Sequence, residues 1–149
     1  MKILITGAAG KLGSRLAQHL IPGPHQLRVM VHKSPIPFNI SGHANLSIYR
    51  ADLAQPHTLP MACEGIDCIV HFAGILFAPL PEKFLPLTNV GYVKNLVEAA
   101  KTASVRTACC SDCSRAVSWR TETYDLQPVT CFLLHHFRDV HIESRLRKQ

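Results

Sequence analysis

The sequence predicts an α/β fold in which a parallel β-sheet carries helices on both faces. Two observations support this prediction. Short apolar segments alternate along the chain with segments whose apolar residues recur at helical spacing. The apolar segments are also continuous, which is typical of strands that are buried on both faces. We therefore expect a doubly wound sheet whose first four strands lie in the order 3-2-1-4.

Four segments have the composition of buried strands. They are short and rich in Ile, Val and Leu, and Gly- or Pro-containing stretches separate them. They occupy residues 2–6, 26–32, 46–52 and 66–74. The segment KSPIPFNISGHAN, between the second and third strands, contains too much Pro and Gly for a helix and is expected to be a loop.

Two segments have helical periodicity. In residues 11–21, Leu12, Leu16 and Leu20 recur at intervals of four, and the sequence PGP then ends the helix. Residues 55–65 predict only a short, poor helix or a turn. In the second helix, residues 89–103, the apolar residues expected on one face are Val90, Val93, Leu96, Val97 and Ala100.

Composition and charge exclude several classes of protein. The chain is 47% hydrophobic and 17% charged, which indicates a globular protein. Its net charge is +6, but the basic residues are scattered singly, so no nucleic-acid groove is expected. No apolar run approaches the roughly 20 residues of a membrane span, and the apolar run after Lys2 is too short for a signal peptide. We therefore expect no membrane association and a cytoplasmic location.

The turn TGAAGKLG carries the most specific functional signal. Gly7, Gly10 and Gly13 are spaced three apart, directly after a strand and at the start of a helix. The first glycine allows a sharp turn, the second lets a pyrophosphate approach the backbone, and the third allows helix and strand to pack closely. Free N–H groups at the helix N-terminus favour the phosphates. The alternative is an ordinary strand–turn–helix whose glycines serve packing alone.

This G-x-x-G-x-x-G spacing resembles that of the extended short-chain dehydrogenases/reductases, the NAD-dependent epimerase/dehydratase family. The stretches ADL (51–53), HFAG (71–74) and TNVGYVKNLVEAAKTASV (88–105) agree with the family in order and spacing. The resemblance covers about residues 1–106. It implies that these residues form a Rossmann-like domain that binds a nicotinamide dinucleotide, and it names no substrate and no oligomeric state.

The resemblance also implies roles for individual residues. Asp52 would accept a hydrogen bond from the adenine amino group, Leu53 would pack on the ring, and Asn89 would steady the backbone near the fourth strand. The alternative for Asp52 is a role as a turn residue or helix N-cap, and Asn89 is itself a good N-cap for the helix it opens, which is compatible with its role near the cofactor. His71 is expected to be an interior histidine with satisfied hydrogen bonds. The residues expected around the pyrophosphate and ribose are Gly7, Ala9, Gly10, Lys11, Leu12, Gly13, Phe72, Ala73 and Gly74.

The second strand ends in VMVHKS, without a carboxylate. An acidic residue there would bind the ribose hydroxyls of NAD, whereas a basic one would accept the extra phosphate of NADP. His32, Lys33 and Ser34 are suited to that phosphate, and Lys11 and Arg15 add positive charge. The alternative is that Lys33 points into solvent. These residues favour NADP over NAD as the cofactor.

The chain lacks the catalytic motif of the family that it resembles. The family's chemistry uses a Tyr with a Lys four positions later, in the pattern Y-x-x-x-K. Tyr49, Tyr92 and Tyr124 are followed at that position by Leu, Leu and Pro. We therefore expect a domain of an oxidoreductase, epimerase or dehydratase that is truncated and weakly active or inactive. The alternative is a non-catalytic nucleotide-binding or regulatory module whose tail binds a partner protein.

Residues 107–149 form an atypical tail that holds four of the six cysteines. TACCS (107–111) stands where the family has a buried fifth strand. Either it is a poor strand, with Ser111 near the family's serine, or the tail results from a frame slip, a splice variant or a gene fragment. A one-base shift turns each codon of the Cys109–Cys110 pair into one for Val or Ala, which would suit a buried strand.

The same cysteines suggest a zinc site, but a second C-x-x-C pair is absent and no metal is expected. Its ligands would be Cys110, Cys113, Cys131 and His135 or His136. Without a neighbour, the fourth strand would be an apolar edge of the sheet. We expect residues 106–111 to lie beside it, and residues 112–128 to be poorly ordered.

Overall fold

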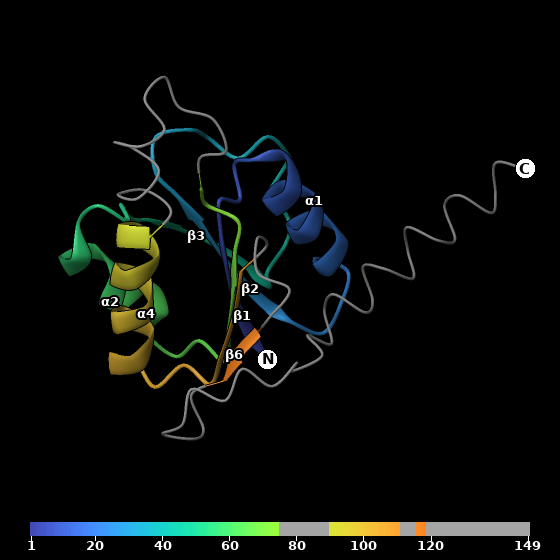
Figure 1. The fold of residues 1–149 in the computed structure, drawn as a ribbon. Coiled ribbons are helices and arrows are strands. Elements are labelled where there is room, and N and C mark those ends of the chain that lie inside the picture. Colours follow the sequence, from blue (N-terminus) through green and yellow to red (C-terminus); the bar gives the residue numbers. More distant parts are fainter. Residues whose placement is uncertain (75–89, 111–115, 119–149) are drawn as a thin grey trace, which may run out of the picture.

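The computed structural model describes residues 1–74, 90–110 and 116–118, and these form three layers (Figure 1). A six-stranded sheet in the order β3-β2-β1-β4-β5-β6 separates α1 from α2 and α4. The predicted order 3-2-1-4 is confirmed, and a parallel fifth strand continues it. The strands are β1 (Lys2–Thr6), β2 (Gln26–Val31), β3 (Leu46–Arg50), β4 (Cys68–His71), β5 (Thr107–Cys110) and β6 (Ala116–Ser118).

The predicted fifth strand is confirmed beside β4. β5 pairs with β4 in parallel, with Cys68 opposite Thr107 and His71 opposite Cys110. β6 then pairs with β5 in the antiparallel direction and was not predicted. It lies within residues 112–128, and all other members of that range fall outside the described residues, as do Ser111 and the proposed zinc ligands after Cys110. The row of strands therefore continues beyond β4, which is not an edge of the sheet.

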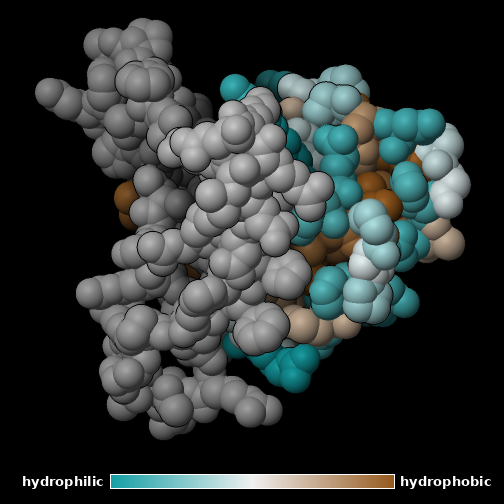
Figure 2. Space-filling view, turned by 90° about the vertical axis from the view of Figure 1, so that its right-hand side faces the viewer, coloured by the Kyte–Doolittle hydropathy of each residue, from teal (hydrophilic) through white to brown (hydrophobic). Residues whose placement is uncertain are grey.

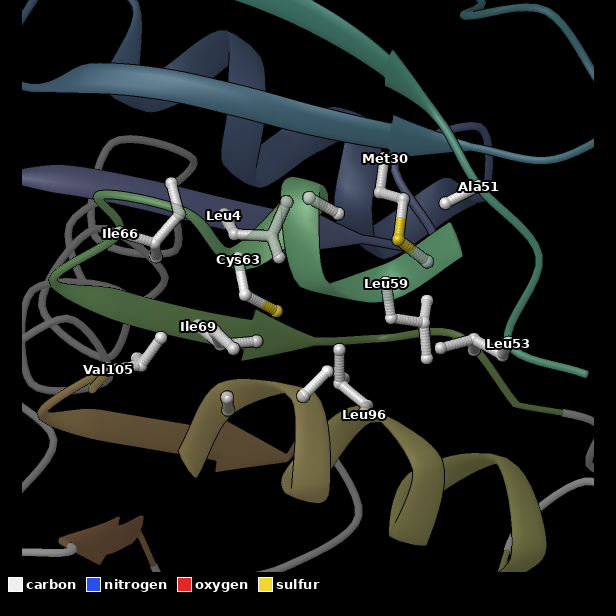
Figure 3. Close-up of a cluster of buried hydrophobic side chains, with 13 residues drawn as sticks. Leu4, Met30, Ala51, Leu53, Leu59, Cys63, Ile66, Ile69, Leu96 and Val105 are labelled. Carbon is white, nitrogen blue, oxygen red and sulfur yellow. The ribbon is translucent and has the colours of Figure 1, made fainter. Parts of the chain in front are cut away.

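Two hydrophobic clusters hold the layers together, one on each face of the sheet, because successive strand side chains point to opposite faces. On the α1 face, Ile3, Ile5 and Val29 pack against Leu16 and Ala17. Hydrophilic residues cover most of the described surface on this side of the molecule (Figure 2). On the other face, the sheet packs against α2 and α4 through Leu4, Met30, Ile69, Leu59 and Leu96 (Figure 3).

The first helix, α1 (Lys11–Leu20), agrees with its predicted range, but not with its predicted apolar face. Leu16 and Leu20 are buried, whereas Leu12 is 54% exposed. The reason is geometric: helical residues recur every 3.6 positions, so an interval of four moves progressively around the helix. Leu12 therefore lies beside the buried face, in the first turn and open to solvent.

The helix predicted over residues 89–103 is present: residues 90–91 form a π-type turn that leads directly into α4 (Tyr92–Thr102). Val90 precedes it and is 66% exposed, so its assignment to the apolar face was wrong. Asn89 lies outside the described residues. The buried residues of α4 are Leu96, Ala99 and Ala100.

The short helical segment predicted between the third and fourth strands is also present. It consists of a 3-10 turn (Pro56–Thr58) and α2 (Leu59–Cys63). Arg28 of β2 donates from Nη1 to the carbonyls of Met61, Ala62 and Glu64 at 2.9–3.1 Å. This side chain caps the C-terminus of a helix too short to be stable alone.

The loop predicted between β2 and β3 is confirmed, since no helix connects these strands. Ile36 and Phe38 of the loop pack against the α1-side cluster. Among the described helices, none is long and apolar enough to cross a bilayer.

Candidate functional site

A cavity of about 400 Å³ opens beyond the carboxyl ends of β1 to β4. In an open parallel sheet, ligands bind at this edge, where the strand order reverses. Here the reversal falls at β1, which has β2 on one side and β4 on the other. The cavity is lined by Gly7, Ala9, Met30, Val31, His32, Lys33, Ser34, Ala51, Asp52, Leu53, Ala73, Gly74 and Tyr92.

The structure brings together most, but not all, of the residues selected from the sequence. Those that line the cavity are Gly7, Ala9, His32, Lys33, Asp52, Leu53, Ala73 and Gly74. Five others lie nearby in the chain without lining it, namely Gly10, Lys11, Leu12, Gly13 and Phe72. Asn89 lies outside the described residues. Lys11 and Arg15 are both exposed on α1.

Two of the three glycines are in such close contact that a side chain would not fit. Gly7 has a φ of +67°, and a Cβ there would lie 2.6 Å from the nitrogen of Ala73 and 2.7 Å from the carbonyl carbon of Phe72. A Cβ at Gly13 would lie 2.8 Å from the carbonyl carbon of Gly7 and would meet the oxygen of Gly7 still closer. The turn after β1 thus packs directly against both the turn after β4 and the first turn of α1.

Gly10 is different, because it is exposed and caps α1. Its N–H donates to the carbonyl of Gly7 at 2.9 Å, and a Cβ there would meet that oxygen at 3.2 Å. No side chain caps this helix, and its first turn contains no acidic residue. The N–H groups of the first turn therefore have no protein acceptor among the described side chains and favour an anion.

Asp52 and His32 meet at the ends of β3 and β2. Their side chains approach to 3.3 Å between His32 Nε2 and Asp52 Oδ2. Asp52 Oδ1 also accepts the N–H of Ala54 at 2.9 Å, so the carboxylate stabilises the turn after β3. The predicted alternative of a turn role is thus present, whereas no side chain caps the following 3-10 turn.

Arg50 adds a further positive charge next to this pair. Its Nη1 donates to the carbonyl oxygen of His32 at 2.6 Å. Together with Lys33 it makes the ends of β2 and β3 basic. Arg50 was not predicted from the sequence, because only the pairing of Val31 with Arg50 in the sheet brings it to the end of β2.

Tyr92 was also missed as a cavity residue. It is the first residue of α4, and it lines the cavity while packing against the cluster beneath it. From the sequence, Tyr92 was tested only for the Y-x-x-x-K pattern of a proton donor. The available signal was its place at the start of the helix that follows the fourth strand.

A buried polar pair lies beneath the cavity. Thr6 is fully buried and His71 is 5% exposed, so His71 is an interior residue as predicted, but its hydrogen bonds are not all satisfied among the described residues. Thr6 Oγ1 and His71 Nδ1 lie 2.7 Å apart, whereas Nε2 has no hydrogen-bond partner among the described residues. Burial lowers the pKa of His71 to about 4, so the ring is neutral near pH 7.

The position of the cavity at the reversal of the strand order, just beyond the glycine turn, defines a Rossmann-type domain. Comparison with known proteins identifies the family. The model of the NAD dependent epimerase/dehydratase family matches residues 3–127, so the chain belongs to this family. The matched range includes β5 and β6 and ends beyond residue 106.

Curated relatives share moderate sequence identity with the chain. UDP-glucose 4-epimerase from Streptomyces lividans is 33% identical over 114 residues, which cover 70% of this chain and 33% of the relative. Uronate dehydrogenase from Pseudomonas syringae is 29% identical over 126 residues, which cover 83% and 44%. The chain thus spans less than half the length of these relatives.

A solved structure shares the fold. Uronate dehydrogenase from Agrobacterium tumefaciens, a point mutant in complex with NAD, is 31% identical with a TM-score of 0.57. The superposition covers 69% of this chain and 37% of that structure. The described domain therefore shares the fold of part of this dehydrogenase.

Proposed function

We propose that this chain binds a nicotinamide dinucleotide in the cavity beyond β1 to β4. The observation that carries the proposal is that the glycine turn borders this cavity. Gly7 and Ala9 line it from the end of β1, and Ala73 and Gly74 line it from the end of β4. A pyrophosphate between them would lie beside the uncapped N-terminus of α1, where N–H groups favour negative charge.

The adenine would lie toward the end of β3. Leu53 is buried and lines the cavity, so it offers an apolar surface to a ring. The carboxylate of Asp52 is 22% exposed and retains lone pairs for the adenine amino group. Asn95 of α4 donates to the carbonyl of Leu53 at 2.9 Å, which fixes this segment against α4.

NADP is the preferred cofactor in this proposal. The basic residues His32, Lys33 and Arg50 surround the end of β2, where the ribose of the adenosine would lie. Among the described residues, Asp52 is the only acidic residue that lines the cavity, and His32 lies against it. Lys33 has no acidic partner within the described ranges, so its charge is available to a phosphate. The relative solved with NAD leaves this preference open to test.

The reaction class follows from the family and not from a catalytic site in this chain. The relatives include an epimerase and dehydrogenases. The chain lacks the Y-x-x-x-K pattern, so we expect the isolated chain to bind the dinucleotide with little or no turnover. The same observation favours a second candidate, a non-catalytic nucleotide-binding module of the cytoplasm.

Titration of the purified chain with NADPH and with NADH, followed by calorimetry, tests the proposal. Saturable binding of at least one dinucleotide is expected. Gly10→Val should weaken it at least about tenfold, because the branched side chain occupies the approach of the pyrophosphate, while the exposed position should still fold.

Gly23→Val is the matched control. A Cβ at Gly23 also meets one carbonyl oxygen at 3.2 Å, that of Leu20, but Gly23 follows the C-terminal end of α1, whereas Gly10 caps its N-terminal end beside the glycine turn. It should leave binding unchanged. A parent that binds neither dinucleotide would contradict the proposal, and so would equal affinity of Gly10→Val and the parent.

A further inference from the structure

The buried pair Thr6–His71 suggests a role that none of the sequence motifs indicates. We propose that His71 is a positioning residue of the dinucleotide site: its unprotonated Nδ1 accepts a hydrogen bond from the hydroxyl of Thr6, so that the oxygen of this hydroxyl is oriented to accept the N–H of the turn after β4. This inference rests on the proposed function and concerns how the two turns that border the cavity are kept together.

The first step is the placement of the pair. Thr6 ends β1, His71 ends β4, and the two are register partners in the sheet. Because side chains alternate along a strand, Thr6 shares the face of Leu4, and His71 shares that of Ile69. α2 and α4 cover this face, and both polar side chains are at least nine-tenths buried.

The second step concerns which atoms of Thr6 and His71 carry a proton and which accept a hydrogen bond. The N–H of Ala73 donates to Thr6 Oγ1 at 3.4 Å, so it uses a lone pair of that hydroxyl. The single hydroxyl proton then goes to His71 Nδ1, 2.7 Å away, if that nitrogen is bare. This requires the tautomer that carries its proton on Nε2. Only that Nε2–H then lacks a partner among the described residues.

The opposite tautomer is less favourable. With a proton on Nδ1, Thr6 would accept two hydrogen bonds and its own proton would have no acceptor in the described part of the chain. Nε2 would lack a donor as well, so two buried groups would be unsatisfied instead of one. Burial also disfavours the charged ring, as the lowered pKa of His71 indicates.

The third step connects this pair to the cavity. Thr6 accepts hydrogen bonds from two consecutive N–H groups of the turn after β4. Phe72 donates to the carbonyl oxygen of Thr6 at 3.3 Å, and Ala73 donates to its hydroxyl oxygen. The same turn touches Gly7, where no Cβ would fit against Ala73. The orientation of the Thr6 hydroxyl therefore fixes the separation of Gly7 from Ala73, which both line the cavity.

The experiment compares two pairs of variants in the full chain. Thr6→Val removes the hydroxyl and keeps the shape, whereas Thr6→Ser keeps the hydroxyl. His71→Leu removes the acceptor, whereas His71→Asn offers an amide oxygen near the place of Nδ1. NADPH affinity should fall about tenfold in the first member of each pair and stay within about threefold in the second.

Nitrogen-15 NMR of the ring gives a readout that simple destabilisation would not move. The parent should show the Nε2–H tautomer at pH 7, with the His71 signals assigned by their loss in His71→Asn. The Ala73 amide should exchange faster in Thr6→Val than in Thr6→Ser. An Nδ1–H tautomer, a charged ring at pH 7, or equal Ala73 exchange in the two Thr6 variants would overturn the inference.

The two proposals fail separately. If the parent bound no dinucleotide, the proposed function would be wrong, while the tautomer and the exchange of Ala73 would still decide the role of His71. If Thr6→Val did not fold, the ring spectrum of the parent would decide it alone.

Discussion

The two sides of the cavity are built by different means. On the side of β1 and β4, the backbone of Gly7 touches that of Phe72 and Ala73, with no space for a side chain. On the side of β2 and β3, the boundary consists of side chains, and His32 and Lys33 are exposed. Close backbone packing determines the first side. The second side consists of charged side chains, which can be substituted without moving the backbone.

This difference indicates how the site divides its tasks. On the β1–β4 side, the backbone contact leaves no space for a Cβ and therefore varies little. Such a fixed boundary is suited to the pyrophosphate, which all dinucleotides share. Side chains at the ends of β2 and β3 can select one ribose from another. Substitutions at the close backbone contacts of the β1–β4 side, Gly7 and Gly13, should therefore affect folding, and those on the β2–β3 side should affect selectivity alone.

The largest effect is expected from Gly13→Val. Its side chain would lie within 3 Å of the backbone of Gly7 and Ala8, and backbone cannot rotate away as a side chain can. We expect a loss of about 3 kcal/mol or more in the free energy of unfolding. Urea denaturation of this variant and of Gly23→Val measures the difference. Equal midpoints for the two variants would show that the close contact at Gly13 is unimportant.

Acid should weaken the β1–β4 side through His71. Its pKa is about 4 in the folded protein and 6.5 in the reference state, so between these values the unfolded chain binds more protons. Stability is therefore complete above pH 6.5 and falls as the pH drops toward 4, by up to about 3 kcal/mol. Denaturant midpoints at several pH values measure this, and the slope should be smaller in His71→Asn.

Within the described part of the chain, the surroundings of His71 supply few other titratable groups. On β1 the neighbour of His71 is the non-ionising Thr6, and the residue in register on β5 is Cys110. The helices over this face supply Tyr92 of α4 and Cys63 of α2. Burial raises the pKa of Cys63 to about 11, so it stays protonated across this range. An unchanged pH slope in His71→Asn would assign the acid sensitivity elsewhere.

On the β2–β3 side, Lys33→Asp should change selectivity without changing stability. The new carboxylate would repel the extra phosphate of NADPH and could accept hydrogen bonds from the ribose of NADH. We expect NADPH affinity to fall at least about tenfold, or roughly 1.4 kcal/mol, with NADH unchanged or tighter. Calorimetric titration with both cofactors is the measurement. Tighter binding of NADH than of NADPH by the parent would contradict the preference.

The smallest effect is expected far from the cavity, at the amino ends of the strands. Asp67 accepts the N–H of Lys2 at 2.8 Å and pairs with Arg106 at 2.9 Å. These contacts lower the pKa of Asp67, first through the Lys2 N–H. Because the pair is exposed, Arg106→Ala should destabilise the protein by less than about 1 kcal/mol. Thermal unfolding measures it, and a larger loss would indicate that this contact holds β5 in place.

The features predictable from the sequence are those with local signals. The glycine turn, four strands and the loop between β2 and β3 each depend on the composition of a short segment, and all are present. Leu12 and Val90 were misplaced because periodicity alone does not locate the centre of a helix face or its first residue. The strand β5 was expected despite its cysteines, because a helix preceded it and β4 needed a neighbour.

The missed features depend on contacts between distant segments. Arg50 reaches the carbonyl of His32 only through the register of β2 and β3. Thr6 and His71 are 65 positions apart in the sequence, and no spacing pattern predicts that they pair. β6 is a three-residue strand whose partner lies just before it in the chain, too short for an alternation pattern to appear.

The pairing of β1 with β4 also has a consequence for the order of folding. Ile3 lies opposite Leu27 on one side and Cys68 on the other, so β1 can join β2 soon after both are synthesised but must wait for β4. Closing the longer loop costs more chain entropy, and parallel pairings of this kind form slowly. The contact between Gly7 and Ala73 is therefore expected to form after the pairing of β1 with β2. A dinucleotide can stabilise the finished sheet by mass action. It cannot guide the assembly of the first three strands, because one side of its cavity is absent until β4 joins the sheet.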